Sequence, residues 1–84
     1  MEPFEVLTKV AKLYNMDVQQ LLSKKDSDEL KYALFALRNY AIITYYDIAQ
    51  IVKCYDMIEI MGIVSTFRKQ HKSTIEMLEN MWDE

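Results

Sequence analysis

The sequence has very little glycine, proline, cysteine or histidine, since each occurs only once among 84 residues. So few helix breakers, together with few β-branched runs, predict an all-helical fold. The single cysteine, Cys54, excludes an intrachain disulfide and a cysteine-based metal cluster. No apolar run approaches the length of a membrane span, and no basic-then-apolar signal opens the chain. We therefore expect a cytoplasmic protein with no role in a membrane.

The sequence also lacks a surplus of basic residues. It has 10 Lys and Arg against 13 Asp and Glu, which gives a net charge of −3. The second half, residues 44–84, holds only four of those bases and seven of the acids. Nucleic-acid-binding proteins usually carry a basic surplus, because counterion release supplies most of their affinity. DNA is therefore a possible partner that the charge disfavours.

What the sequence does have is apolar residues at helical spacing, enough for one domain over residues 1–84 with a modest core. The spacing predicts a small bundle of five or six helices. The first expected helix opens at Pro3 and turns inward Phe4, Leu7, Val10, Ala11 and Tyr14. A short helix capped by Asp17 follows, and then a longer one from an Asp26–Glu29 capping box to about Ile42, whose inward residues are Leu30, Ala33, Leu34, Leu37 and Ala41. Two more helices are expected within residues 44–70 and a last one over 73–82.

Residues 44–70 read as a helix-turn-helix. Thr44 with Asp47 and Asp56 with Glu59 each resemble a capping box that starts a helix. A tight turn at residues 53–55 separates the two helices. Such a pair presents the start of its second helix to the DNA major groove. The expected inward residues are Tyr45, Ile48 and Val52 on the first helix and Ile60, Ile63, Val64 and Phe67 on the second.

The last helix has two possible starts. Ser73 with Glu76 is a regular capping box, which favours a new helix there with Ile75, Leu78, Met81 and Trp82 inward. The alternative is one helix that runs on from residue 57 through Lys72.

Three segments carry a resemblance to a known family. They are VLTKVAKLYNMDVQQLL at 6–22, followed by Ser23 and Lys24; TYYDIAQIV at 44–52; and KCYDMIEIMGIVSTF at 53–67. In order and spacing they resemble the C-terminal DNA-binding domain of DnaA, the bacterial replication initiator. The resemblance covers roughly residues 4–70 and implies an all-helical domain with a helix-turn-helix.

The residues that contact DNA in that family are replaced in this chain. Lys53 and Cys54 stand where the family has two glycines, so the turn must form without one. Asp56 keeps an aspartate whose role is to cap the helix. In the family an arginine, a histidine and two threonines contact bases or phosphates. Their replacements are Tyr55 for the arginine, Met57 for the histidine, and Ile58 and Glu59 for the threonines.

Three of the replaced positions, Tyr55, Met57 and Ile58, belong to a larger apolar surface in this sequence. If Ile60, Ile63, Val64 and Phe67 point inward, five large side chains point outward, beside Gly62. Either the last helix folds back over them, or a protein partner or a second copy covers them. They are the candidate protein-contact residues, Tyr46, Tyr55, Met57, Ile58 and Met61.

The sequence thus favours a non-catalytic interaction or regulatory module that binds a protein partner or itself as a homodimer. The alternative is a DNA-binding domain of altered specificity, in replication or transcription control. It would contact phosphates through Lys53, Arg68, Lys69 and Lys72.

An enzyme is not expected. His71 is flanked by lysines, and Cys54 has no base near it in sequence. There is no glycine-rich phosphate loop and no carboxylate cluster at metal-ligand spacing. We therefore expect no catalytic residue, cofactor, metal or small-molecule substrate.

Overall fold

Six α-helices and one π-helical turn make up residues 1–81, the part of the chain that this computed structural model describes. No strand occurs in that range, so the predicted all-α fold is confirmed. The elements are α1 (Pro3–Leu13), α2 (Val18–Ser23), α3 (Asp28–Ala36), the π-helical turn η1 (Leu37–Ala41), α4 (Tyr45–Ile51), α5 (Met57–Gln70) and α6 (Lys72–Met81).

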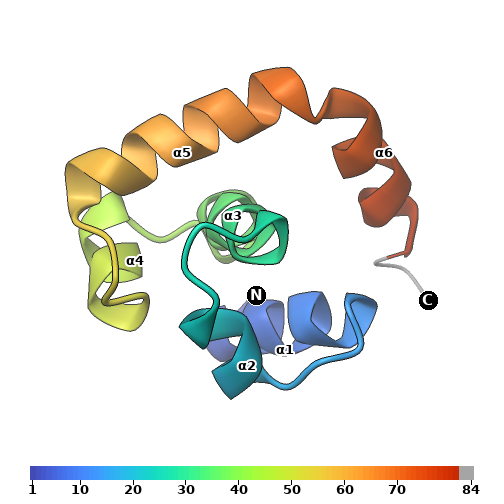
Figure 1. The fold of residues 1–84 in the computed structure, drawn as a ribbon, viewed down its shortest axis with the longest axis horizontal. Helices are drawn as coiled ribbons and strands as arrows, with labels where there is room; N and C mark the ends of the chain where they lie inside the picture. The colour runs from blue at the N-terminus through green and yellow to red at the C-terminus, as the bar shows by residue number, and fades with distance from the viewer. Residues whose placement is uncertain (82–84) are drawn as a thin grey trace.

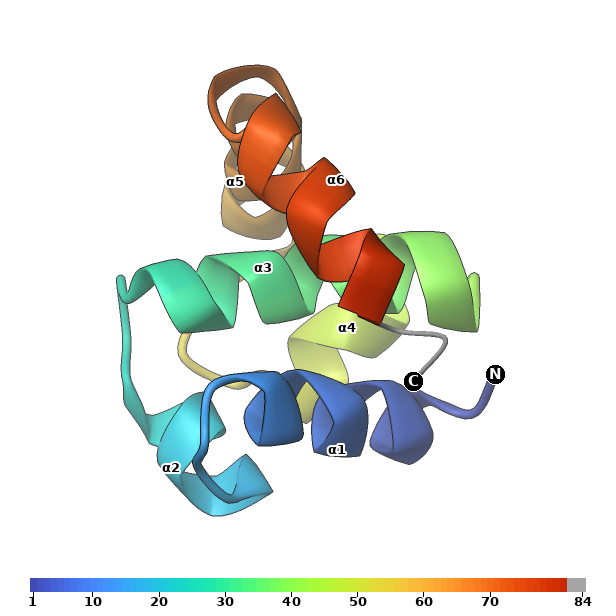
Figure 2. The same cartoon turned by 90° about the vertical axis from the view of Figure 1, so that its right-hand side faces the viewer.

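Helix α3 lies at the centre of the molecule, between α1 on one side and α5 on the other (Figures 1 and 2). A helix that is apolar on most of its circumference must be buried, and α3 meets that condition. Tyr32 on α3 is fully buried, and its ring centre lies about 6 Å from those of Phe35 and Phe67. These three rings form the aromatic cluster of the core. Helices α1, α2 and α5 pack directly against α3. The buried residues of α3 are Leu30, Tyr32, Ala33, Leu34, Phe35 and Ala36.

The predicted inner face of α1 is wrong at one position. Phe4 was expected inside, but 69% of its surface is exposed. The buried face is centred on Val6 and Val10, with Leu7 and Ala11 beside them. By helical spacing Phe4 lies on the side of Leu7 and Ala11, but it is in the first turn of α1 and lines an open surface groove with Thr8 and Lys12 instead of packing into the core. Pro3 opens the helix, as predicted, with a capping box between Glu2 and Glu5.

The start of α3 also differs from the prediction. Ser27, not Asp26, is the N-cap residue, and its hydroxyl accepts a hydrogen bond from the Leu30 N–H. Asp26 instead takes a left-handed backbone conformation with φ of 65°, which aspartate tolerates better than most residues. The predicted end near Ile42 is confirmed: η1 follows α3, and Ile42 closes it in the left-handed region.

Helices α4 and α5 follow the predicted layout. Thr44 caps α4, and Asp56 and Glu59 form a reciprocal capping box at the start of α5. The turn between them, residues 52–56, contains no residue with positive φ, so it does not need a glycine. The inward residues Ile48, Val52, Ile60, Val64 and Phe67 are buried, whereas Tyr45 and Ile63 are half-buried. The interpretation of this pair as a helix-turn-helix stays a prediction.

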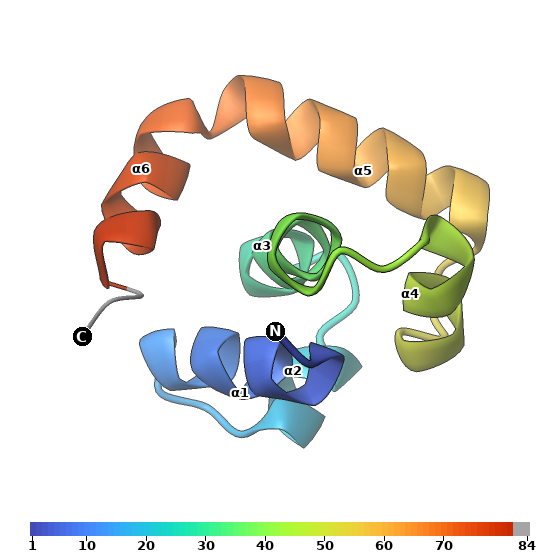
Figure 3. The same ribbon diagram turned by 180° about the vertical axis from the view of Figure 1, so that it is seen from behind.

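A break at His71 separates α5 from α6, so the single continuous helix is ruled out. His71 ends α5 and stacks its ring on Phe67, with 4.6 Å between the ring centres. Helix α6 begins at Lys72, one residue before the predicted start, and turns down past α3 (Figure 3). Ile75 and Leu78 are buried, as predicted. The predicted inward positions of Met81 and Trp82 fall outside the described side chains.

The two phenylalanines give a matched test of this core. We expect Phe67→Ala, at a residue only 3% exposed, to lower the free energy of unfolding by about 3–5 kcal/mol. Phe4→Ala removes the same atoms from an exposed site and should change the free energy of unfolding by less than about 0.5 kcal/mol. Urea unfolding followed by circular dichroism measures both. Equal losses would show that Phe4 belongs to the core after all.

Candidate interaction surface

The start of α5 exposes three large apolar side chains. Ile58 is 76% exposed, Met61 44% and Met57 43%. Met57 and Met61 are one helical turn apart and therefore lie on the same side of α5, with Ile58 beside them. We call these three residues the α5 patch. Their exposure follows from the packing of α5, which turns Ile60, Val64 and Phe67 towards the core.

The described part of α6 does not cover the α5 patch. Helix α6 leaves from the opposite end of α5, and its chain descends on the side of α3 and α1 (Figures 1 and 3). Its buried residues, Ile75 and Leu78, belong to the common core. The alternative in which the last helix folds back over the patch is therefore wrong for residues 72–81.

Of the two candidate tyrosines, only one is exposed. Tyr46, on α4, points to solvent as expected. Tyr55 was also expected outside, but it is only 5% exposed, which corrects the prediction. Its hydroxyl donates to the Asp26 carboxylate at 2.9 Å and accepts from the Asp26 backbone N–H at 2.7 Å. Burial raises the pKa of the Tyr55 phenol, so the group remains protonated and able to donate at neutral pH.

This tyrosine joins two distant loops. Asp26 lies between α2 and α3, and Tyr55 lies in the turn between α4 and α5, 29 residues later. The bond fixes the position of the turn and hence the start of α5. Sequence reasoning missed it, because Asp26 was interpreted as a helix cap. The available signal was Ser27, a second N-cap residue that left Asp26 free for another role.

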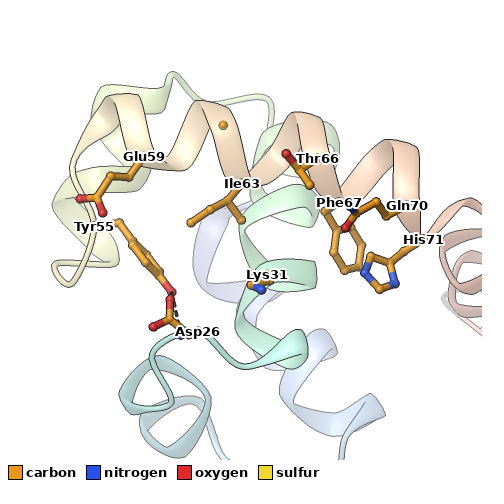
Figure 4. A pocket seen from close by; sticks show the side chains of 10 residues that line it. Asp26, Lys31, Tyr55, Glu59, Ile63, Thr66, Phe67, Gln70 and His71 are labelled. Carbon is orange, nitrogen blue, oxygen red and sulfur yellow. Dashed lines mark hydrogen bonds between the residues drawn. The ribbon is translucent and has the colours of Figure 1, made fainter.

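A groove of about 450 Å³ runs along the other flank of α5 (Figure 4). Tyr55, Ile63 and Phe67 supply its apolar lining. Asp26 and Glu59 lie at one end, while His71 lies at the other (Figure 4). Gly62 also lines the groove, and a Cβ atom built there would meet no atom within 4 Å. The outer side of α5 is thus open at its middle and allows close approach by another backbone.

The charged residues of this region are divided between the two ends of α5. Asp56 and Glu59 are exposed at its start, and their carboxylates already accept hydrogen bonds from each other's backbone N–H groups. Lys69 and Lys72 are exposed at its end. A rise of 1.5 Å per residue puts Glu59 and Lys69 about 15 Å apart along the helix.

The four candidate phosphate-contact residues do not form one cluster. Lys53 precedes α5, whereas Arg68, Lys69 and Lys72 lie at its far end. Arg68 is also engaged within the fold: its Nη2 donates to the Asn39 Oδ1 at 2.9 Å, and its guanidinium lies 5.5 Å from the centre of the Phe35 ring. The start of α5, which would enter a DNA groove, carries no cation between Asp56 and Phe67.

Within residues 1–81, no three His, Cys, Asp or Glu side chains are grouped so that they could hold a metal ion. His71 stacks on Phe67, and Cys54 is half-buried in the turn before α5. No helix in the same range is both long enough and apolar enough to cross a bilayer.

Comparisons with protein-family models, with curated proteins and with solved structures find no match to this chain. The resemblance to the DNA-binding domain of DnaA therefore stays a prediction from the sequence. The proposed function therefore rests on the exposed side chains and the charges of α5.

The bond between Tyr55 and Asp26 can be tested by removing one oxygen atom. We expect Tyr55→Phe to lower the free energy of unfolding by about 1–2 kcal/mol, because two partly buried hydrogen bonds are lost. Tyr46→Phe deletes an exposed hydroxyl and should have no measurable effect. Thermal unfolding of both variants gives the comparison. An unchanged midpoint for Tyr55→Phe would mean that water replaces the bond at no cost.

Proposed function

We propose that this chain is a small non-catalytic interaction module that binds protein through the α5 patch. The observation that carries the proposal is that Met57, Ile58 and Met61, neighbours on α5, keep 43%, 76% and 44% of their surfaces exposed. A small domain rarely leaves such neighbouring side chains bare without a use for them. Burying each one contributes roughly 1.5–3 kcal/mol before ordering costs are subtracted.

The kinds of side chain support this proposal. Methionine is flexible and polarisable, so it adapts to an irregular partner surface. Aromatic residues and methionine are enriched at the centres of protein interfaces, and exposed Tyr46 on α4 adds a further anchor. Carboxylates at the edge, from Asp56 and Glu59, would form part of a polar rim.

The same carboxylates weigh against DNA as the ligand. Both are held at the start of α5 by the capping box, so they cannot withdraw without loss of the cap. A phosphate brought to this end would meet two negative charges in place of the basic residues that phosphate binding requires. The DnaA-like sequence pattern then describes an inherited scaffold, and a regulator that acts on replication or transcription through protein contacts fits that scaffold.

One substitution tests the proposed surface. We expect Ile58→Asp to abolish association with protein, because a charge replaces the most exposed apolar side chain of the patch. Helicity should survive, since an acid in the first turn of a helix is favourable. Met77→Asp, at an exposed methionine on α6, is the matched control and should retain binding. Affinity purification with light scattering measures association. The proposal fails if the wild type neither captures a protein nor self-associates, or if both variants behave alike.

DNA binding is tested separately by fluorescence anisotropy. We expect no binding of mixed-sequence duplexes at low salt, because the start of α5 is apolar and acidic. Binding at micromolar or lower concentration that weakens steeply with added salt would overturn this expectation and favour the altered-specificity alternative. Lys69→Gln would then locate the phosphate contacts.

A further inference from the structure

The outermost residues of α5 form a single exposed stripe. Ile58, Gly62, Ser65 and Lys69 follow one another at intervals of four, three and four residues, which places them on one side of a helix. All four are exposed. We call them the outer stripe. Figures 1 and 3 show α5 along one edge of the molecule, with no described element on its outer side.

The charge next to the outer stripe reverses along the helix. Asp56 and Glu59 give the start a charge of −2, whereas Arg68, Lys69 and Lys72 give the end +3, and Lys69 lies on the stripe itself. A ligand of uniform charge would match one end and be repelled by the other. The complementary surface must be positive beside the start and negative beside the end. The outer stripe of a second copy of this chain, running in the opposite direction, is such a surface.

We propose that the occupant of the outer stripe is a second copy of this chain, with the two α5 helices antiparallel about a twofold axis near residue 64. The inference rests on the proposed function, because it names the partner of the α5 patch. A twofold axis can pair a helix with itself in a parallel or an antiparallel way. The parallel arrangement brings like charges together at both ends. The antiparallel one brings Glu59 of each copy level with Lys69 of the other.

The middle of the stripe fits this arrangement sterically. With the axis near residue 64, Gly62 of one copy faces the region of Ser65 and Thr66 of the other. These side chains are small, and a Cβ at Gly62 would meet nothing within 4 Å in the single chain, so the backbones can come close. Towards the ends, Ile58 of one copy meets the aliphatic stem of Lys69 of the other, which shields it from water while the ammonium stays solvated.

The size of the contact sets the expected affinity. Fourteen residues make α5 about 21 Å long, so one helix pair forms a contact at the small end of stable interfaces. We therefore expect a dimer that dissociates on dilution. Sedimentation velocity over a wide range of concentrations should show a reversible shift from monomer to dimer.

Cysteine cross-linking tests the direction of pairing in a Cys54→Ser background. Near the axis, Ser65→Cys places its two copies about 3 Å apart along the helix direction, so oxidation should link them. Lys69→Cys, which is also on the outer stripe, places its two copies about 15 Å apart along the helix and should not link. Efficient linkage at both positions would mean parallel pairing and would overturn the proposal. Linkage at neither, with a monomer at every concentration, would overturn it as well.

A charge reversal tests the complementarity without any cross-linking. We expect Lys69→Glu to weaken the dimer about tenfold, because each of two symmetric contacts changes from attraction to repulsion. Lys53→Glu makes the same change in net charge outside the stripe and should leave the dimer constant within about twofold. Equal effects of the two variants would overturn the antiparallel arrangement. If the wild type is monomeric but still captures another protein in an Ile58-dependent way, the proposed function stands and the dimer is rejected.

Discussion

The packing of α5 against the aromatic cluster of α3 is the constraint on which the rest of the surface depends. Phe67 lies about 6 Å from the rings of Tyr32 and Phe35, and Ile60 and Val64 occupy the same side of the helix. A helix that buries one side has its opposite side fixed by geometry. The exposure of Ile58 is therefore a consequence of core packing. A different rotation of α5 would have to expose Phe67.

The sequence predicted those parts of the fold that local chemistry determines. The caps at Asp17, Thr44 and Asp56 were predicted correctly, because each depends on a residue and its neighbours within one turn. Phe4, Tyr55 and Asp26 were misplaced for a common reason. Their positions depend on contacts between segments far apart in the chain. For Tyr55 the partner lies 29 residues away, and helical spacing holds no information about it.

The candidate surface was predictable to a similar degree. The exposure of Met57, Ile58 and Met61 follows from the phase of one helix, which the apolar spacing revealed. The sequence could not show whether the last helix covers them, since that depends on the direction in which the chain turns at His71. The break there sends α6 down past α3, away from the patch (Figure 3). One local change of direction therefore leaves the outer side of α5 open to a partner.

The cap of α5 links stability to recognition. Asp56 and Glu59 satisfy backbone N–H groups that would otherwise lack partners, so the fold fixes two carboxylates at this point. On the proposed function, a ligand of the α5 patch must accommodate these two charges, which disfavours a polyanion. The hydroxyl of Tyr55 fixes the turn that carries the cap, so the position of the two charges is set by the α2–α3 loop as well. The residues that stabilise the start of α5 are thus the same ones on which the proposed preference for protein over DNA depends.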